Sequence, residues 1–142
     1  MSEFTPREQY VRIVYLGIVF MFLSISFNSL SNIVAKIYDD YGLYNLGQAA
    51  TMALYTAYGI TTFFSSYIIR LLGFKKSMLF GSLGCTVFEV VGIVVAIEPD
   101  VPAIWIWVIV IGGSILCGIG SSVMWVSQSG YLSEVASENR KN

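Results

Sequence analysis

The residue of this 142-residue sequence best suited to chemistry is an acid within an apolar run. Glu89 is the single charged residue between Ser77 and Ile97, a stretch long enough to cross a bilayer as a helix. A charged carboxylate facing lipid at that depth costs about 3 kcal/mol, so Glu89 should face protein or water. Two interpretations stay open. Glu89 is a proton- or cation-sensitive group, or it remains protonated and hydrogen-bonds a neighbouring helix.

Polar side chains also gather in two other apolar runs. Asn28 and Asn32 are one helical turn apart and share a face, and Gln128 and Tyr131 belong to a polar cluster late in the sequence. Amides and hydroxyls on inward faces of membrane helices line water-filled paths or form hydrogen bonds between helices. We predict that these four residues line a cavity. Hydrogen bonding between helices near the membrane ends is the alternative.

Other kinds of chemistry have little support in the sequence. The chain has no histidine, which excludes imidazole bases and histidine metal sites, and its net charge of −1 leaves no basic face for nucleic acid. Cys85 and Cys117 lie in apolar runs and are interpreted as small packing residues. No phosphate-binding loop, paired carboxylates or nucleophile motif is present. We therefore predict no enzymatic activity, cofactor, metal site or nucleic-acid partner.

The elements that must hold these residues are membrane helices. Apolar residues make up 56% of the chain and charged residues 12%, about half the charged share of an average soluble domain. Each of four long uncharged runs exceeds the ~20 residues that span a bilayer. We predict an all-α, polytopic transmembrane helix bundle, with one domain over 1–142 and helices at about 11–36, 43–69, 77–97 and 103–132.

The distribution of basic residues predicts the orientation, because cytoplasmic loops are rich in Lys and Arg. With both termini in the cytoplasm, only Lys36 of the eight basic residues lies outside, whereas Asp39, Asp40, Glu98 and Asp100 gather there. The bilayer is the first predicted partner, in either the plasma membrane or an endomembrane. Aromatic residues near the predicted interfaces, Tyr38 among them, are typical of an aromatic belt and receive no functional role.

Small residues recur at four-residue spacing in the second and fourth runs. Such stripes let helix backbones approach closely, so we predict two helix-packing faces. A flexible gating helix is the alternative. The stripes are formed by Ala49, Ala53 and Ala57 and by Ser114, Gly118 and Ser122.

Three segments together resemble a known family. They are residues 27–32, residues 69–76 and residues 118–134, and the most specific pattern combines Trp125, Gln128, Gly130, Tyr131 and Leu132. The sequence resembles the Unc-ninety-three family of ion-channel regulatory proteins, a branch of the major facilitator superfamily. The resemblance makes 69–76 a cytoplasmic loop, marked by Arg70, Gly73, Lys75 and Lys76. The wider superfamily has an acid where this sequence has Arg70.

The resemblance implies the N-terminal part of a transporter-like fold whose first and fourth helices line a central cavity. Full members have about twelve spans built from three-helix repeats, so four helices make one repeat and the start of the next. Either the chain is a fragment, or it docks against another membrane protein in place of the missing transporter helices. Family members regulate or escort channels or receptors, and we expect that role here. The alternatives are a small-solute or ion secondary transporter, as a fragment or an oligomer, and a structural subunit of a membrane complex.

Overall fold

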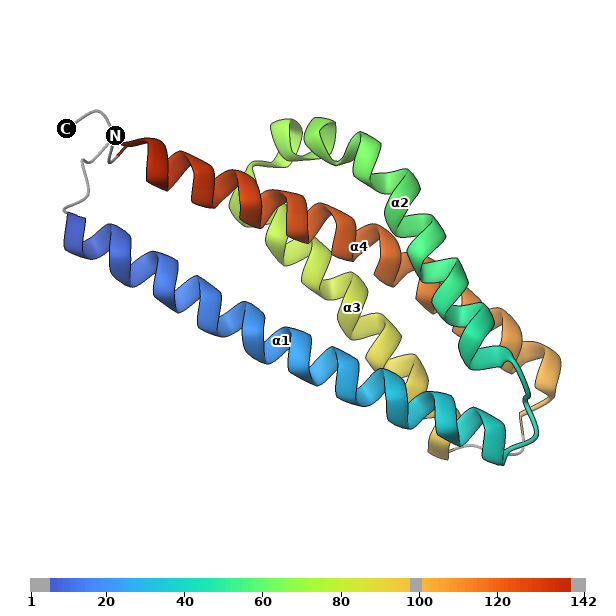
Figure 1. Ribbon diagram of the computed structural model, residues 1–142. Helices are drawn as coiled ribbons and strands as arrows, with labels where there is room; N and C mark the ends of the chain where they lie inside the picture. Colours follow the sequence, from blue (N-terminus) through green and yellow to red (C-terminus); the bar gives the residue numbers. More distant parts are fainter. Residues whose placement is uncertain (1–5, 98–100, 139–142) are drawn as a thin grey trace.

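The computed structural model describes residues 6–97 and 101–138, and within them the chain forms four α-helices. The helices are α1 (Pro6–Asp40), α2 (Leu46–Leu72), α3 (Phe74–Ile97) and α4 (Ala103–Glu138). The all-α bundle expected from the sequence is confirmed (Figure 1). The limits of α2 and α3 and the start of α4 lie within three residues of the predicted ones. Helix α1 begins and ends about four or five residues beyond its predicted limits, and α4 ends about six residues later, because both continue past the apolar runs into polar sequence. Four residues used for the orientation lie outside the described ranges: Glu98, Asp100, Arg140 and Lys141.

Glycine sets the two short turns at either end of α2. Gly42 has a φ of 74° and precedes α2, where Asn45 also takes the left-handed conformation with a φ of 70°. Gly73 has a φ of 78° and a ψ of 159°, a region that only glycine enters readily, and its backbone N–H donates to the carbonyl of Ile69 at 2.7 Å. Helix α3 therefore starts immediately after α2 ends.

Helices α3 and α4 touch through glycine. A Cβ atom added at Gly81 would lie 2.5 Å from the carbonyl oxygen of Gly120, and one added at Gly84 would lie 2.8 Å from that of Leu116. Side chains of any size would hold these backbones apart, so the glycines set the separation of the two helices.

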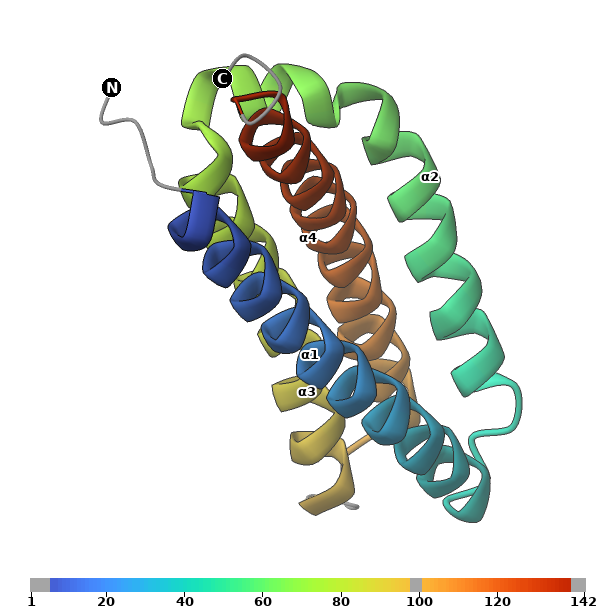
Figure 2. The same cartoon turned by 60° about the vertical axis from the view of Figure 1, so that its left-hand side comes forward.

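Helix α4 also packs against α2, and it lies between α2 and α3 (Figure 2). At Gly118 an added Cβ would collide with the carbonyl oxygen of Leu54 and lie 3.0 Å from the Cβ of Ala57. One turn further along α4, the buried Ser122 hydroxyl lies 2.9 Å from the hydroxyl of Ser65 and 3.0 Å from that of Thr62. Close backbone approach and hydroxyl hydrogen bonds thus hold this pair together.

Helix α1 is less completely packed. Two ring pairs attach its middle to the bundle: Phe20 meets Trp125 of α4 edge-on at 5.3 Å, and Phe27 meets Phe88 of α3 at 5.8 Å. Near its end α1 is closer to its neighbours, because Cβ atoms added at Gly47 and Gly92 would lie 3.1 and 3.0 Å from Ala35 and Val34 side chains. The remaining faces of α1 carry large exposed apolar side chains, which suits contact with lipid.

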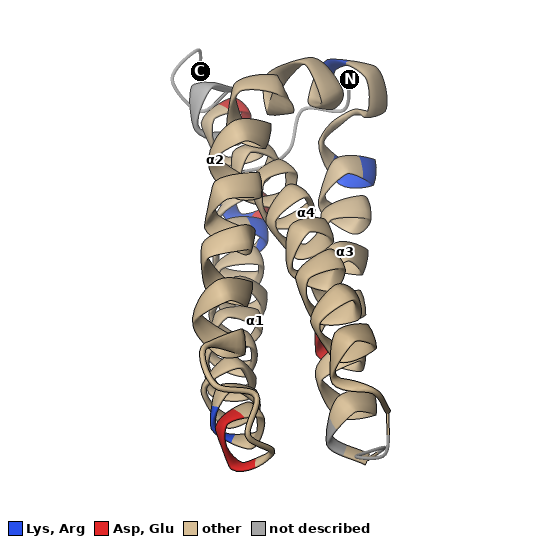
Figure 3. Ribbon diagram, turned by 90° about the vertical axis from the view of Figure 1, so that its right-hand side faces the viewer, with Lys and Arg blue, Asp and Glu red and all other residues tan. Residues whose placement is uncertain are grey.

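By length and composition, three helices of the described chain can cross a membrane, over Arg7–Asp40, Phe74–Val95 and Ala103–Val135. Helix α2 is not among them, although its 27 residues would extend about 40 Å. Threonine, serine and tyrosine lower its hydropathy, so a fourth crossing remains a prediction. Figure 3 shows most charged residues near the two ends of the bundle, with few along the middle of the helices.

Candidate functional site

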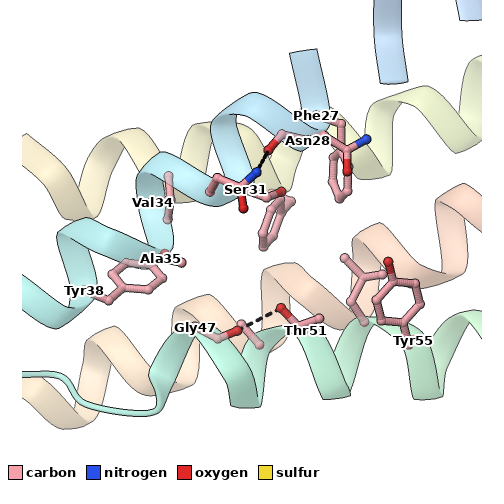
Figure 4. A pocket seen from close by; sticks show the side chains of 13 residues that line it. Phe27, Asn28, Ser31, Val34, Ala35, Tyr38, Gly47, Thr51 and Tyr55 are labelled. Carbon is pink, nitrogen blue, oxygen red and sulfur yellow. Dashed lines mark hydrogen bonds between the residues drawn. The ribbon is translucent and has the colours of Figure 1, made fainter. Parts of the chain in front are cut away.

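The candidate site is a cleft between α1 and α2 with a volume of about 230 Å³. We call it the α1–α2 cleft, and Figure 4 shows side chains from both helices facing it. Phe88 of α3 closes part of its floor. The polar residues that line it are Asn28, Ser31, Asn32, Tyr38, Thr51 and Tyr55.

Two hydroxyl groups in the cleft have no hydrogen-bond partner among the described residues. Tyr38 is 2% exposed, and its hydroxyl oxygen is buried without a partner; the same holds for the hydroxyl of Ser31. A buried hydroxyl left unpaired costs about 1–3 kcal/mol. The wall of the cleft therefore contains two buried hydroxyl groups that the surrounding side chains do not satisfy.

The two asparagines predicted to line a cavity both lie in this cleft. Asn28 donates from Nδ2 to the carbonyl of Ser24 at 2.8 Å, and Asn32 donates from Nδ2 to the carbonyl of Asn28 at 2.9 Å. These bonds to the preceding turn fix the direction of both amides. Each amide has a second N–H and a carbonyl oxygen for another partner.

A second hollow, of about 180 Å³, continues from the cleft towards α4. It shares Phe27, Asn28, Leu54 and Tyr55 with the cleft and ends at Cys85, Ser121 and Trp125. The Ser121 hydroxyl lies 3.2 Å from the Sγ of Cys85 and 3.7 Å from that of Cys117, and both thiols are free and buried. The polar path thus runs from the end of α1 towards the middle of the bundle.

The other predicted site residues lie elsewhere. Tyr131 lies in a separate hollow at the opposite end of the bundle, beside Arg12 and Lys75. Gln128 lines neither hollow, and its Oε1 is buried with no partner in the described part of the chain. Glu89 is half-buried on α3, one turn after Cys85, and lines neither hollow. The structure therefore brings together the asparagines but not Gln128, Tyr131 or Glu89.

Part of the two predicted small-residue stripes lies at the contact between α2 and α4. Ser114 and Ser122 are fully buried, and Gly118 meets Ala57 as described above. Ala49 and Ala53 are half-buried. In the loop, Gly73 forms the turn between α2 and α3, whereas Arg70, Lys75 and Lys76 are exposed around it.

One side of α2 carries a polar stripe that was not predicted from the sequence. Its residues are all exposed and recur every three or four positions, so they follow one side of the helix: Gln48, Thr51, Tyr55, Gly59, Thr62 and Ser66. The neighbouring exposed side is apolar and includes Met52, Ile60 and Phe63. Counting the polar positions at helical spacing would have found the stripe, which average hydropathy conceals.

Long apolar helices with outer faces suited to lipid define a helical integral membrane protein, with a polar cleft between two of its helices. The sequence matches the Major Facilitator Superfamily over residues 14–142, and the chain belongs to that family.

Two curated proteins are similar to this chain in sequence. The chain is 25% identical over 128 residues to "UNC93-like protein 3" of Arabidopsis thaliana, covering 89% of this chain and 24% of the relative. It is 28% identical over 121 residues to "Putative potassium channel regulatory protein unc-93" of Caenorhabditis elegans, covering 84% of this chain and 15% of the relative. The chain thus spans less than a quarter of the length of either. No solved structure matches it closely.

Proposed function

We propose that this chain acts as part of an Unc-ninety-three-type membrane protein that regulates or escorts a channel partner, without enzymatic activity. Similarity to a relative named for potassium channel regulation supports the proposal. The observation that carries it is the exposed polar stripe of α2. Hydroxyl and amide groups facing hydrocarbon are unfavourable, so this side of α2 should meet protein or water rather than lipid.

The stripe is suited to a helix of another membrane segment. Gln48 and Ser66 offer hydrogen bonds near the two ends of α2, and Gly59 leaves room for a close approach, since nothing lies within 4 Å of an added Cβ. Such features hold membrane helices together. The covering segment is either a partner protein or further helices of a longer transporter-like chain.

The experiment measures potassium current in cells that express a panel of potassium channels with or without this chain. The test variant replaces Gln48 and Ser66, which lie in the stripe but outside the α1–α2 cleft, with leucine. The control variant replaces Met52 and Ile60, on the apolar side, with leucine. We expect the unaltered chain and the control to change the current of at least one channel, and the stripe variant to lose that effect. Equal effects of the two variants would contradict the proposal.

A second candidate function, secondary transport of a small solute, is favoured by the polar side chains that line the α1–α2 cleft. Asn28, Asn32 and Tyr55, which line the cleft and are exposed, would bind a small neutral polar molecule, such as a polyol or an amide, through hydrogen bonds. Glu89 is the proposed proton- or cation-sensitive group, because it is the one acid within the α3 span.

Uptake of labelled polyols and amides into vesicles containing the chain, driven by a proton or sodium gradient, tests this candidate. Glu89→Gln should abolish the dependence on the gradient while leaving solute exchange intact. Val90→Ala, on the same helix and exposed, is the matched control. If uptake by the Glu89→Gln variant still depends on the gradient, Glu89 is not the proton- or cation-sensitive group.

A further inference from the structure

A hollow at the far end of the bundle has an apolar surface, and two of the residues that border it are basic. It has a volume of about 210 Å³ and lies between the starts of α1 and α3 and the end of α4. We call it the basic cleft, and its lining residues are Arg12, Tyr15, Leu16, Lys75, Met78 and Tyr131. Neither the family match nor the α1–α2 cleft accounts for this combination.

The order of these residues along the helices separates charge from apolar surface. Arg12 precedes Leu16 by one turn of α1, and Lys75 precedes Met78 by almost one turn of α3. Both helices run inward from this end of the bundle. At a rise of about 1.5 Å per residue, each cation lies roughly 5 Å closer to the end than the apolar side chain on its helix. The two basic residues therefore lie nearer the end of the bundle than the apolar lining of the hollow.

We propose that the basic cleft binds one anionic phospholipid. The phosphate would lie between the Arg12 guanidinium and the Lys75 ammonium, and the start of an acyl chain would lie along Leu16 and Met78. Arg12 takes part in another interaction within the chain. A guanidinium has five N–H donors, so it can serve a second acceptor and matches phosphate oxygens in geometry.

The lining favours a lipid over a free anion. A small anion is held best by donors on several sides, whereas Leu16 and Met78 offer only apolar contact. The tyrosines suit the headgroup level: Tyr15 is 70% exposed, and Tyr131 is half-buried. Basic clefts between membrane helices attract anionic lipids of the cytoplasmic leaflet, and the predicted orientation places this end there.

Lipid retention by the purified 142-residue chain tests the proposal. The chain is extracted into micelles containing dioleoylphosphatidylserine or dioleoylphosphatidylcholine, and bound lipid is counted by native mass spectrometry. Arg12→Gln with Lys75→Gln should weaken phosphatidylserine binding about tenfold or more. The matched control, Arg70→Gln with Lys76→Gln, removes two exposed cations at the same end that do not line the cleft. It should change binding by about twofold or less.

Three results would overturn the proposal: equal loss in both double variants, equal retention of the two lipids by the unaltered chain, or displacement of phosphatidylserine by millimolar inorganic phosphate. Met78→Trp gives an independent test, because it fills the apolar part and keeps both charges. It should also lower phosphatidylserine retention while circular dichroism shows unchanged helix content. Unchanged retention in a folded Met78→Trp chain would contradict the acyl-chain position.

Discussion

At the scale of single residues, Tyr38 presents the clearest conflict between burial and hydrogen bonding. Its side chain packs with Val34, Leu46 and Val95, which excludes water, yet its hydroxyl has no partner among the described residues. Tyr38→Phe removes the unpaired group and keeps the ring. We expect the free energy of unfolding of the solute-free chain to rise by about 1–2 kcal/mol, measured by circular dichroism during denaturation in detergent.

Tyr55→Phe is the control for this prediction. Tyr55 lines the same cleft but is 65% exposed, so its hydroxyl is accessible and its removal should change stability by less than about 0.5 kcal/mol. Loss of stability in Tyr38→Phe would show that the hydroxyl has a hydrogen-bond partner after all.

The sequence predicted some of these residues and not others, for a physical reason. Asn28 and Asn32 were predicted to line a cavity because amides are unusual in an apolar run, and both lie in the α1–α2 cleft. Tyr38 was assigned to the aromatic belt, since a tyrosine near a span end is common there. Its burial depends on α2 and α3 folding back over it, and no local pattern encodes that contact.

At the scale of helices, Gly118 controls the distance between α2 and α4. Any side chain there collides with the carbonyl of Leu54, which belongs to backbone and cannot move aside. We expect Gly118→Ala to lower the free energy of unfolding by about 1–3 kcal/mol, measured by the same denaturation experiment.

Gly112 on the same helix provides the comparison, because nothing lies within 4 Å of an added Cβ. Gly112→Ala should be neutral or stabilising by up to about 1 kcal/mol, since alanine favours helix. Equal effects at the two positions would mean that helix propensity, and not interhelical contact, determines both.

Helix faces were predictable where one kind of residue repeats. The stripe of Ser114, Gly118 and Ser122 is visible in the sequence and is buried in the structure. The contact between Gly81 and Gly120 was not predictable, because it requires the register of α3 against α4. The polar stripe of α2 lies on the same helix as strongly apolar residues, so polar and apolar contributions cancel when hydropathy is averaged over the run.

At the scale of the whole molecule, the main test is whether α2 crosses the membrane. Asp39 and Lys76 flank α2 near its two ends and are both exposed. We expect a membrane-impermeant maleimide to label Asp39→Cys but not Lys76→Cys in intact cells, because four crossings place these residues on opposite sides.

The unaltered chain is the background control, since Cys85 and Cys117 are buried. Permeabilised cells should label both variants. Equal labelling in intact cells would show that α2 does not cross, in agreement with its low hydropathy and against the predicted orientation.

The uneven packing of α1 has a mechanical consequence. Val34 and Ala35 lie close to Gly92 and Gly47 near the C-terminal end of α1, whereas Arg12 lies near its N-terminal end. Helix α1 is therefore held most closely near one end, beside the α1–α2 cleft, and a tilt about that point would move its other end furthest. A tilt of about 5° would move Arg12 by roughly 3 Å, given the helical rise between these positions. The ring pairs of Phe20 with Trp125 and of Phe27 with Phe88 lie between these two positions, so any such tilt would have to displace both contacts.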